Sequence, residues 1–205
     1  AGPNVFRYLG VADEERVGEE RMNELAAQVQ ASLRGNQDMS TQPTMAEILP
    51  RIEQSIQRVV QAVTALPEAA RVEPRLPGDR SVKDVLGHIT WWDQWLLLTL
   101  PPAPGEPAAA ITLPLADQIP PNDHWADAMN AKVLAYNKPR AFTPIWQEFN
   151  ATRAALVKRV SQLSAADLYD PAGMSATIGQ PVAPLVCGIY EHYEEHAHEF
   201  ESLKA

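Results

Sequence analysis

The chain has 205 residues, which is enough for one domain with a full hydrophobic core. Its formal net charge at pH 7 is -9, and its 17 Lys and Arg residues are scattered among 26 acidic residues. Phosphate backbones and anionic lipid surfaces would repel such a chain, so we expect no nucleic-acid partner and no membrane-surface role.

The hydrophobic runs are too short for a membrane protein. The longest, Trp91–Leu100, is interrupted by Asp93 and Gln94 and falls short of the ~20 apolar residues that a membrane span needs. The single cysteine, Cys187, rules out an internal disulfide and is typical of a reducing compartment. We therefore expect a soluble, cytoplasmic protein.

Two regions of different character divide the chain: an N-terminal extension, residues 1–38, and a main domain, residues 39–205. Within the extension, apolar residues recur at helical spacing between positions 13 and 33, which predicts a helical segment. Two interpretations stay open. The extension is either a docking or dimerising helix, which would favour a homodimer, or a remnant of an expression tag before a natural start at Met39.

Helical periodicity dominates the first half of the main domain. Two long helices are predicted, over residues 44–66 and 81–100, and each starts with a capping box: Thr44 with Glu47, and Ser81 with Asp84. The proline-rich stretch 101–121 that follows is predicted to be an ordered loop or lid. A shorter helix, capped by Asn122, is predicted over residues 123–137.

The second half continues this pattern. Thr143 and Pro144 predict a helix start, as a cap followed by proline, and apolar spacing extends that helix to Leu163. A short turn or helix at 164–167, an extended piece at 175–182 and a final helix to Leu203 complete the chain. This order of elements predicts an all-α fold, a four-helix bundle with additional short helices and an N-terminal helical extension.

Three histidines lie on the predicted apolar faces of two of these helices. His192 and His196 are one turn apart in the last helix, and His88 lies in the tryptophan-rich helix. An isolated pair of this spacing also occurs by chance, and a single core histidine is more often satisfied by a hydrogen bond than by a metal. Three inward histidines together predict a shared metal site with one open position. Tyr193 excludes the zincin motif, which places Glu after the first histidine.

Several carboxylates accompany these histidines in the sequence. Glu199, Glu195 and Asp93 are candidates for a catalytic base, and Glu199 or Asp84 could instead orient a ligand imidazole. Each of these carboxylates could instead be an ordinary charged side chain that faces solvent on its helix.

The remaining aromatic and histidine side chains have simpler interpretations. We expect most of the three tryptophans in the second long helix, Trp91, Trp92 and Trp95, to belong to the hydrophobic core. Because they cover more than one face of the helix, at least one of them is expected to line a cleft. His198 is predicted to lie at the surface, and His124 to stand at a helix start.

Four segments resemble the ClbS/DfsB family of four-helix-bundle proteins, part of the DinB/YfiT-like group: SVKDVLGHITWWDQWLL (81–97), MNAKVLAYN (129–137), WQEF (146–149) and YEHYEEH (190–196). The resemblance spans roughly residues 44–203. It implies a divalent metal, zinc or nickel, held at the positions of His88, His192 and His196. It also implies activities such as thiol-dependent transfer and isomerisation, or hydrolysis that protects against electrophilic genotoxins.

The leading hypothesis is therefore a metal-dependent hydrolase or thiol-transferase-like detoxification protein, whose partners are an electrophilic small molecule or a thiol. Three alternatives stay open. The same side chains could form a metal-free acid/base hydrolase, the bundle could sequester a small molecule without catalysis, or the protein could serve as a scaffold.

Overall fold

The computed structural model describes residues 42–119 and 125–203. Within these ranges the chain forms eight α-helices and one short 3-10 helix, with no β-strand, which confirms the all-α prediction. The predicted N-terminal extension, the Asn122 cap and His124 lie outside the described residues. None of the described helices is long and apolar enough to cross a membrane.

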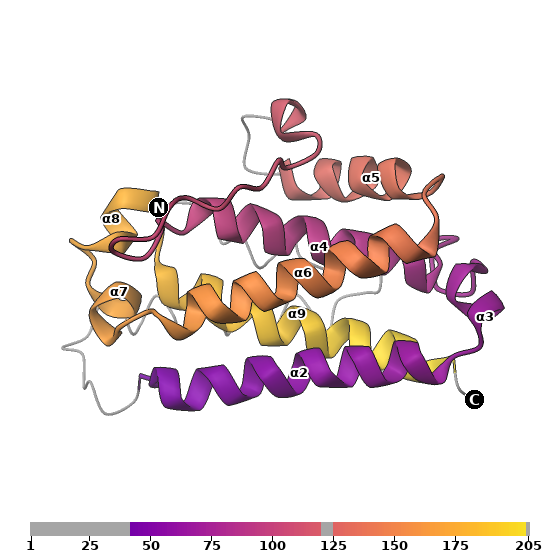
Figure 1. Cartoon of the computed structure of the whole chain (residues 1–205), viewed down its shortest axis with the longest axis horizontal. Helices are drawn as coiled ribbons and strands as arrows, with labels where there is room; N and C mark the ends of the chain where they lie inside the picture. Colours follow the sequence, from indigo (N-terminus) through magenta and orange to yellow (C-terminus); the bar gives the residue numbers. More distant parts are fainter. Residues whose placement is uncertain (1–41, 120–124, 204–205) are drawn as a thin grey trace, which may run out of the picture.

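Four long helices form the bundle: α2 (Met45–Ala65), α4 (Val82–Thr99), α6 (Phe142–Ser161) and α9 (Val182–Ser202). Helix α2 packs along α9, α4 packs along α6, and α4 also contacts α9 (Figure 1). In the first pair, Arg51 forms a hydrogen bond with Tyr190, and Arg58 forms one with Glu201. Because residue numbers increase in the same direction along both helices, α2 and α9 are parallel. The α4–α6 pair is parallel as well, and the two pairs run in opposite directions (Figure 1).

Short helices connect these four. Helix α3 (Glu68–Val72) lies between α2 and α4, and the proline-rich stretch leads through η3 (Ala116–Gln118) toward α5 (Trp125–Asn137). Between α6 and α9 the chain forms α7 (Ala165–Tyr169) and α8 (Met174–Ile178). The predicted extended piece at 175–182 is therefore wrong, because its first half belongs to α8, which is capped by Gly179 with a φ of 76°.

Both predicted capping boxes are present. The backbone N–H of Thr44 donates to Glu47, and that of Ser81 donates to Asp84. The predicted start of α6 at Thr143 is wrong, since α6 begins at Phe142 after an extended residue. Pro144 is the third residue of this helix, where a backbone N–H has no intrahelical acceptor, so proline is tolerated there. The earlier start also allows the Phe142 ring to stack on Trp146.

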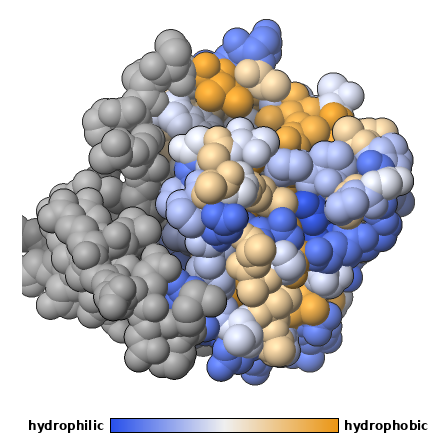
Figure 2. Space-filling model, turned by 90° about the vertical axis from the view of Figure 1, so that its left-hand side faces the viewer, coloured by the Kyte–Doolittle hydropathy of each residue, from blue (hydrophilic) through white to orange (hydrophobic). Residues whose placement is uncertain are grey.

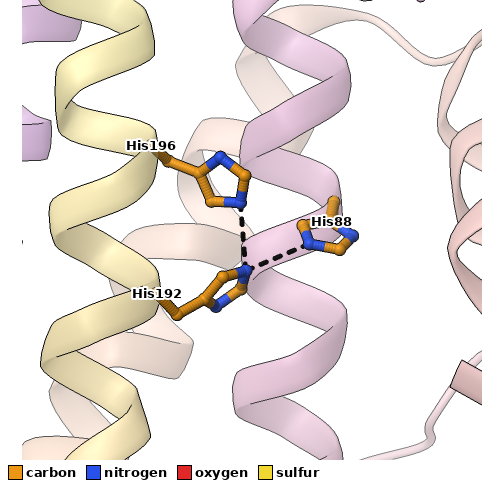
Figure 3. Close-up of side chains that lie close together, drawn as sticks. All are labelled: His88, His192 and His196. Carbon is orange, nitrogen blue, oxygen red and sulfur yellow. Dashed lines mark hydrogen bonds between the residues drawn. The ribbon is translucent and has the colours of Figure 1, made fainter. Parts of the chain in front are cut away.

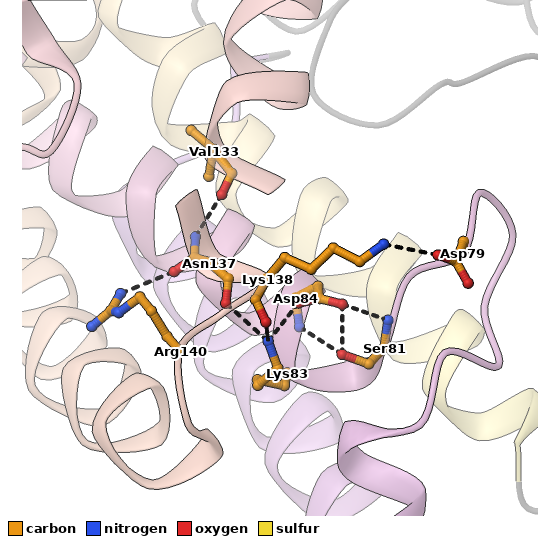
Figure 4. Close-up of polar contacts among 8 residues, drawn as sticks. All are labelled: Asp79, Ser81, Lys83, Asp84, Val133, Asn137, Lys138 and Arg140. Atoms are coloured by element: carbon orange, nitrogen blue, oxygen red, sulfur yellow. Dashed lines mark hydrogen bonds and ion pairs between the residues drawn. The ribbon is translucent and has the colours of Figure 1, made fainter. Parts of the chain in front are cut away.

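A buried lysine forms hydrogen bonds that connect the start of α4 to the end of α5. Lys83 Nζ donates hydrogen bonds to Oδ1 of Asp84 and to the backbone oxygens of Asn137 and Lys138, over 2.7, 2.9 and 3.1 Å (Figure 4). A cation at a helix C-terminus satisfies carbonyl groups that have no partner within the helix. Burial would raise the pKa of Asp84, but hydrogen bonds from Lys83 and Ser81 lower it overall.

Candidate metal centre

Three histidine side chains from two antiparallel helices meet inside the bundle. Nε2 of His192 lies 3.0 Å from Nε2 of His88 and 3.0 Å from Nε2 of His196 (Figure 3). One nitrogen from each ring lies within 4.8 Å of the other two. His192 and His196 are buried, whereas His88 is partly exposed. The structure thus brings together the three residues that the sequence predicts to be ligands.

Helix geometry explains this convergence. His192 and His196 are one turn apart on the buried face of α9, which also carries Ile189 and Phe200. His88 projects from α4, the neighbour that runs in the opposite direction. Both helices are held by core contacts on either side of the cluster, so the three imidazoles are positioned by the packing of the bundle.

The hydrogen bonds of these rings are compatible with a cation among them. Nδ1 of His196 lies 2.8 Å from a carboxylate oxygen of Glu199, so this nitrogen carries the ring's proton and Nε2 presents a lone pair. Burial, followed by the charges of His196 and His88, lowers the pKa of His192 and keeps that ring neutral. If all three rings are neutral, only one of the two 3.0 Å contacts can be a proper hydrogen bond.

A divalent ion would instead use the lone pairs of all three nitrogens. Two nitrogens that bind one ion at ~2.1 Å lie about 3.0 to 3.4 Å apart at octahedral or tetrahedral angles. The 3.0 Å separations between His192 and its two neighbours match the lower end of this range. The residues present therefore fit a zinc or nickel ion, and three ligands leave at least one position open for water or substrate.

Glu199 is the candidate carboxylate nearest to the cluster. Its Oε2 bonds to His196, while its Oε1 accepts a hydrogen bond of 2.6 Å from Nη2 of Arg80. Burial would raise the pKa of Glu199, but the hydrogen bond and charge of His196 and the charge of Arg80 lower it overall. Sequence reasoning missed Arg80, because it belongs to no motif and reaches α9 only through the folded turn before α4.

Asp93 and Glu195 stand in different surroundings. Asp93 is buried and accepts a hydrogen bond of 2.5 Å from the Tyr193 hydroxyl. It is not among the side chains whose ligand atoms converge within 4.8 Å. Burial raises the pKa of Asp93 to about 7, although the Tyr193 hydrogen bond opposes this. Glu195 is partly buried beside His196, and burial raises its pKa above the usual value for a glutamate.

One ring of a tryptophan cluster lies beside His88. The Trp92 ring lies edge-on to the His88 ring, with centroids 6.4 Å apart, and Trp92 donates from Nε1 to Asn130. Trp91 is also buried, whereas Trp95 is partly exposed and packs against Trp92 and Trp125. This cluster, which joins α4 to α5, is mostly core, as the sequence predicts. His198 is exposed, which confirms its predicted surface position.

A cavity of about 580 Å³ lies at the end of the bundle where α4 finishes, and it contains none of the candidate site residues. Its α4 lining begins at Leu97, more than two helical turns beyond His88. Figure 2 faces this end of the molecule, where apolar and polar surface alternate. The candidate metal centre and this cavity are therefore separate features.

The fold and the site define a helical bundle in which two long helices bring three histidines to one point. This chain belongs to the DinB superfamily, whose family model matches residues 51–199 and so includes all three histidines. Comparisons with curated proteins and with solved structures gave no significant match.

Proposed function

We propose that this protein is a metal-dependent enzyme that acts on an electrophilic small molecule, by hydrolysis or by addition of a thiol. The observation that carries this proposal is the convergence of the His88, His192 and His196 nitrogens at one point inside the bundle. We further propose that it belongs to the ClbS/DfsB branch, on the four segments that resemble that family, and that it is cytoplasmic, on its single cysteine.

The three imidazoles would hold zinc or nickel, which supplies Lewis-acid chemistry: a lower pKa for bound water or thiol, or a polarised electrophile. Because the imidazole ligands are neutral, they leave the positive charge of the site undiminished. The partial exposure of His88 supports an approach of substrate from that side of the cluster. The buried Trp92 ring, edge-on to His88, would help to exclude water from that side of the site.

A base for this reaction must reach the open side of the cluster. Glu195 is the better placed candidate, because it is partly exposed, lies next to His196 in sequence and has a pKa raised by burial. Asp93 also has a raised pKa, but it is buried in the bundle interior and its carboxylate is bound to the Tyr193 hydroxyl. A Glu195→Gln variant is therefore expected to lower turnover more than Asp93→Asn does.

Metal analysis tests the proposal. Protein purified without a nickel column should contain close to one equivalent of zinc or nickel, and His192→Ala or His196→Ala should abolish binding. His198→Ala is the matched control, because it removes an exposed histidine from the same helix. Less than a tenth of an equivalent in the wild type, together with thermal stability unchanged by a chelator, would contradict a metal centre.

Turnover of a reactive electrophile, such as an activated ester or an epoxide, separates the enzyme from a sequestering protein. Many turnovers per chain that disappear in His88→Ala support the enzyme. Protection that stops at one equivalent would instead indicate stoichiometric binding. Metal-independent turnover in fully chelated protein would favour the acid/base hydrolase.

A further inference from the structure

A tight turn before α4 places Arg80 at the edge of the candidate metal centre. Leu76 and Arg80 pair through their backbones, with N to O distances of 2.9 and 3.4 Å. Gly78 and Asp79 at the tip have φ values of 72° and 57°, in the left-handed region that favours glycine and tolerates Asp. Ser81, the N-cap of α4, follows directly. The position of Arg80 is thus fixed by the same segment that starts the His88 helix.

The guanidinium group of Arg80 bridges this turn and α9. Its Nε donates to the backbone oxygen of Pro77 over 2.8 Å, and its Nη2 donates to Oε1 of Glu199 over 2.6 Å. Both side chains are only about one-fifth exposed, at 22% and 20%. The pair is therefore held from both ends and is more shielded from water than a surface salt bridge.

Glu199 transmits this contact to the cluster. One carboxylate oxygen accepts from Arg80, and the other accepts from Nδ1 of His196 over 2.8 Å. A carboxylate that holds the far nitrogen of a ligand imidazole fixes its tautomer, orients the ring and raises its basicity. Removal of such partners typically weakens metal binding by about 10- to 100-fold.

We propose that Arg80 is a positioning residue of the metal centre, which acts through Glu199 to hold the lone pair of His196 Nε2 toward the bound ion. This inference rests on the proposed function, because it assumes that the three histidines bind metal. It also assigns Glu199 an orienting role in place of the catalytic one, since both of its oxygens are engaged.

The forked shape of arginine suits this role. Two different nitrogens, Nε and Nη2, contact Pro77 and Glu199 at the same time, whereas lysine carries all its donors on one terminal nitrogen and has none at the position of Nε. Arg80→Lys should therefore keep the charge beside Glu199 but lose the anchor to the turn. We expect its metal affinity to lie between those of the wild type and Arg80→Gln.

The matched control is Arg58→Gln. Arg58 on α2 pairs with Glu201 on the same helix α9, at 2.9 Å, with side chains that are 32% and 38% exposed. Arg58 and Glu201 both lie close to His198, a surface residue outside the histidine cluster. Both variants remove one arginine that ties α9 to another segment. A purely structural role would therefore affect the two variants alike.

Two measurements test the proposal: the metal dissociation constant from competition with a chromophoric chelator, and the His196 tautomer in metal-free protein from nitrogen-15 NMR. Arg80→Gln should bind zinc about 10- to 100-fold more weakly, and its His196 should lose the preference for a proton on Nδ1. Arg58→Gln should change neither quantity.

Affinity within twofold of the wild type in Arg80→Gln, with an unchanged tautomer, would overturn the inference, as would equal losses in Arg58→Gln. A wild type that binds no metal would contradict the proposed function instead. In that case the tautomer comparison still decides whether Arg80 orients His196. Similar melting temperatures for the metal-free variants would show that the differences do not arise from unfolding.

Discussion

The Tyr193 hydroxyl donates a hydrogen bond of 2.5 Å to Oδ2 of Asp93, between the two helices that carry the histidine cluster. Both residues are buried. Tyr193 lies between His192 and His196 in α9, and Asp93 lies in α4 together with His88. The bond therefore joins the two helices close to the cluster, and its strength depends on the protonation state of Asp93.

Asp93 should make stability depend on pH. Burial raises its pKa to about 7 in the folded protein, whereas an unfolded aspartate has a pKa near 3.9. The folded state therefore binds more protons between these values, so this group's contribution to stability falls as pH rises from about 4 to about 7. Asp93→Asn removes the titration and retains an acceptor for Tyr193.

Urea unfolding of the wild type and Asp93→Asn at pH 5 and pH 8 measures this effect. The free energy of unfolding of the wild type should drop more between the two pH values than that of the variant. Burial lowers the pKa of His192, which opposes this trend in both proteins, so the comparison cancels it. Equal pH dependence in the two proteins would contradict the assignment to Asp93.

Tyr193→Phe should destabilise the protein by about 1 to 3 kcal/mol, because it leaves a buried carboxyl group without its hydrogen-bond donor. The loss should be larger at pH 8 than at pH 5, since an ionised Asp93 depends more on that donor. Urea unfolding at both pH values checks this. Tyr169→Phe is a suitable control, because the Tyr169 hydroxyl bonds to the backbone oxygen of Pro43 at an exposed position. A pH-independent loss would show that the hydroxyl does not support the charged form.

Periodicity in the sequence is sufficient to predict the helical bundle and the inward placement of the three histidines, and three inward histidines in one bundle suggest that they meet. Inward histidines replace leucines at regular helical spacing, and a bundle leaves few directions in which His88 can point. Capping boxes fixed the starts of α2 and α4 for the same local reason.

Contacts between distant segments could not be read from these local patterns. The Arg80 contact with Glu199 depends on a turn that folds back toward α9, and residues far apart in sequence give no periodic signal. Asp84 illustrates the same limit. It was a candidate to orient His88, but the structure shows it bonded to Ser81 and Lys83, a pairing that requires α5 to end beside α4.

Lys83→Met tests the buried cap of α5. The variant leaves the carboxylate of Asp84 without its ion-pair partner and the carbonyl oxygens at the end of α5 without their donor. Removal of one member of a buried ion pair typically costs about 3 to 5 kcal/mol. Lys138→Met is the matched control, since its exposed ion pair with Asp79 should contribute little to stability. Chemical denaturation of both variants gives the comparison, and similar losses would show that the buried lysine has no special role.

Gly87, the residue before His88, faces the side chain of Asn137 at the contact between α4 and α5. A Cβ atom at position 87 would lie 2.4 Å from Cγ of Asn137, which is too close without movement. Asn137 cannot move freely, because it donates to the backbone oxygen of Val133 and accepts from Arg140 (Figure 4). Gly87→Ala should therefore push α5 away from α4 beside the metal centre.

We expect Gly87→Ala to destabilise the protein by about 1 to 3 kcal/mol and to weaken metal binding, although alanine in a helix normally gains about 1 kcal/mol over glycine. Gly173→Ala is the control, because its nearest neighbour would lie at an ordinary 3.4 Å. The double variant Gly87→Ala with Asn137→Ala should recover part of the lost metal affinity, since it removes the clashing atoms. Thermal unfolding and chelator competition measure both effects. If Gly87→Ala proved as stable as the wild type, the close approach of Asn137 would not constrain the His88 helix.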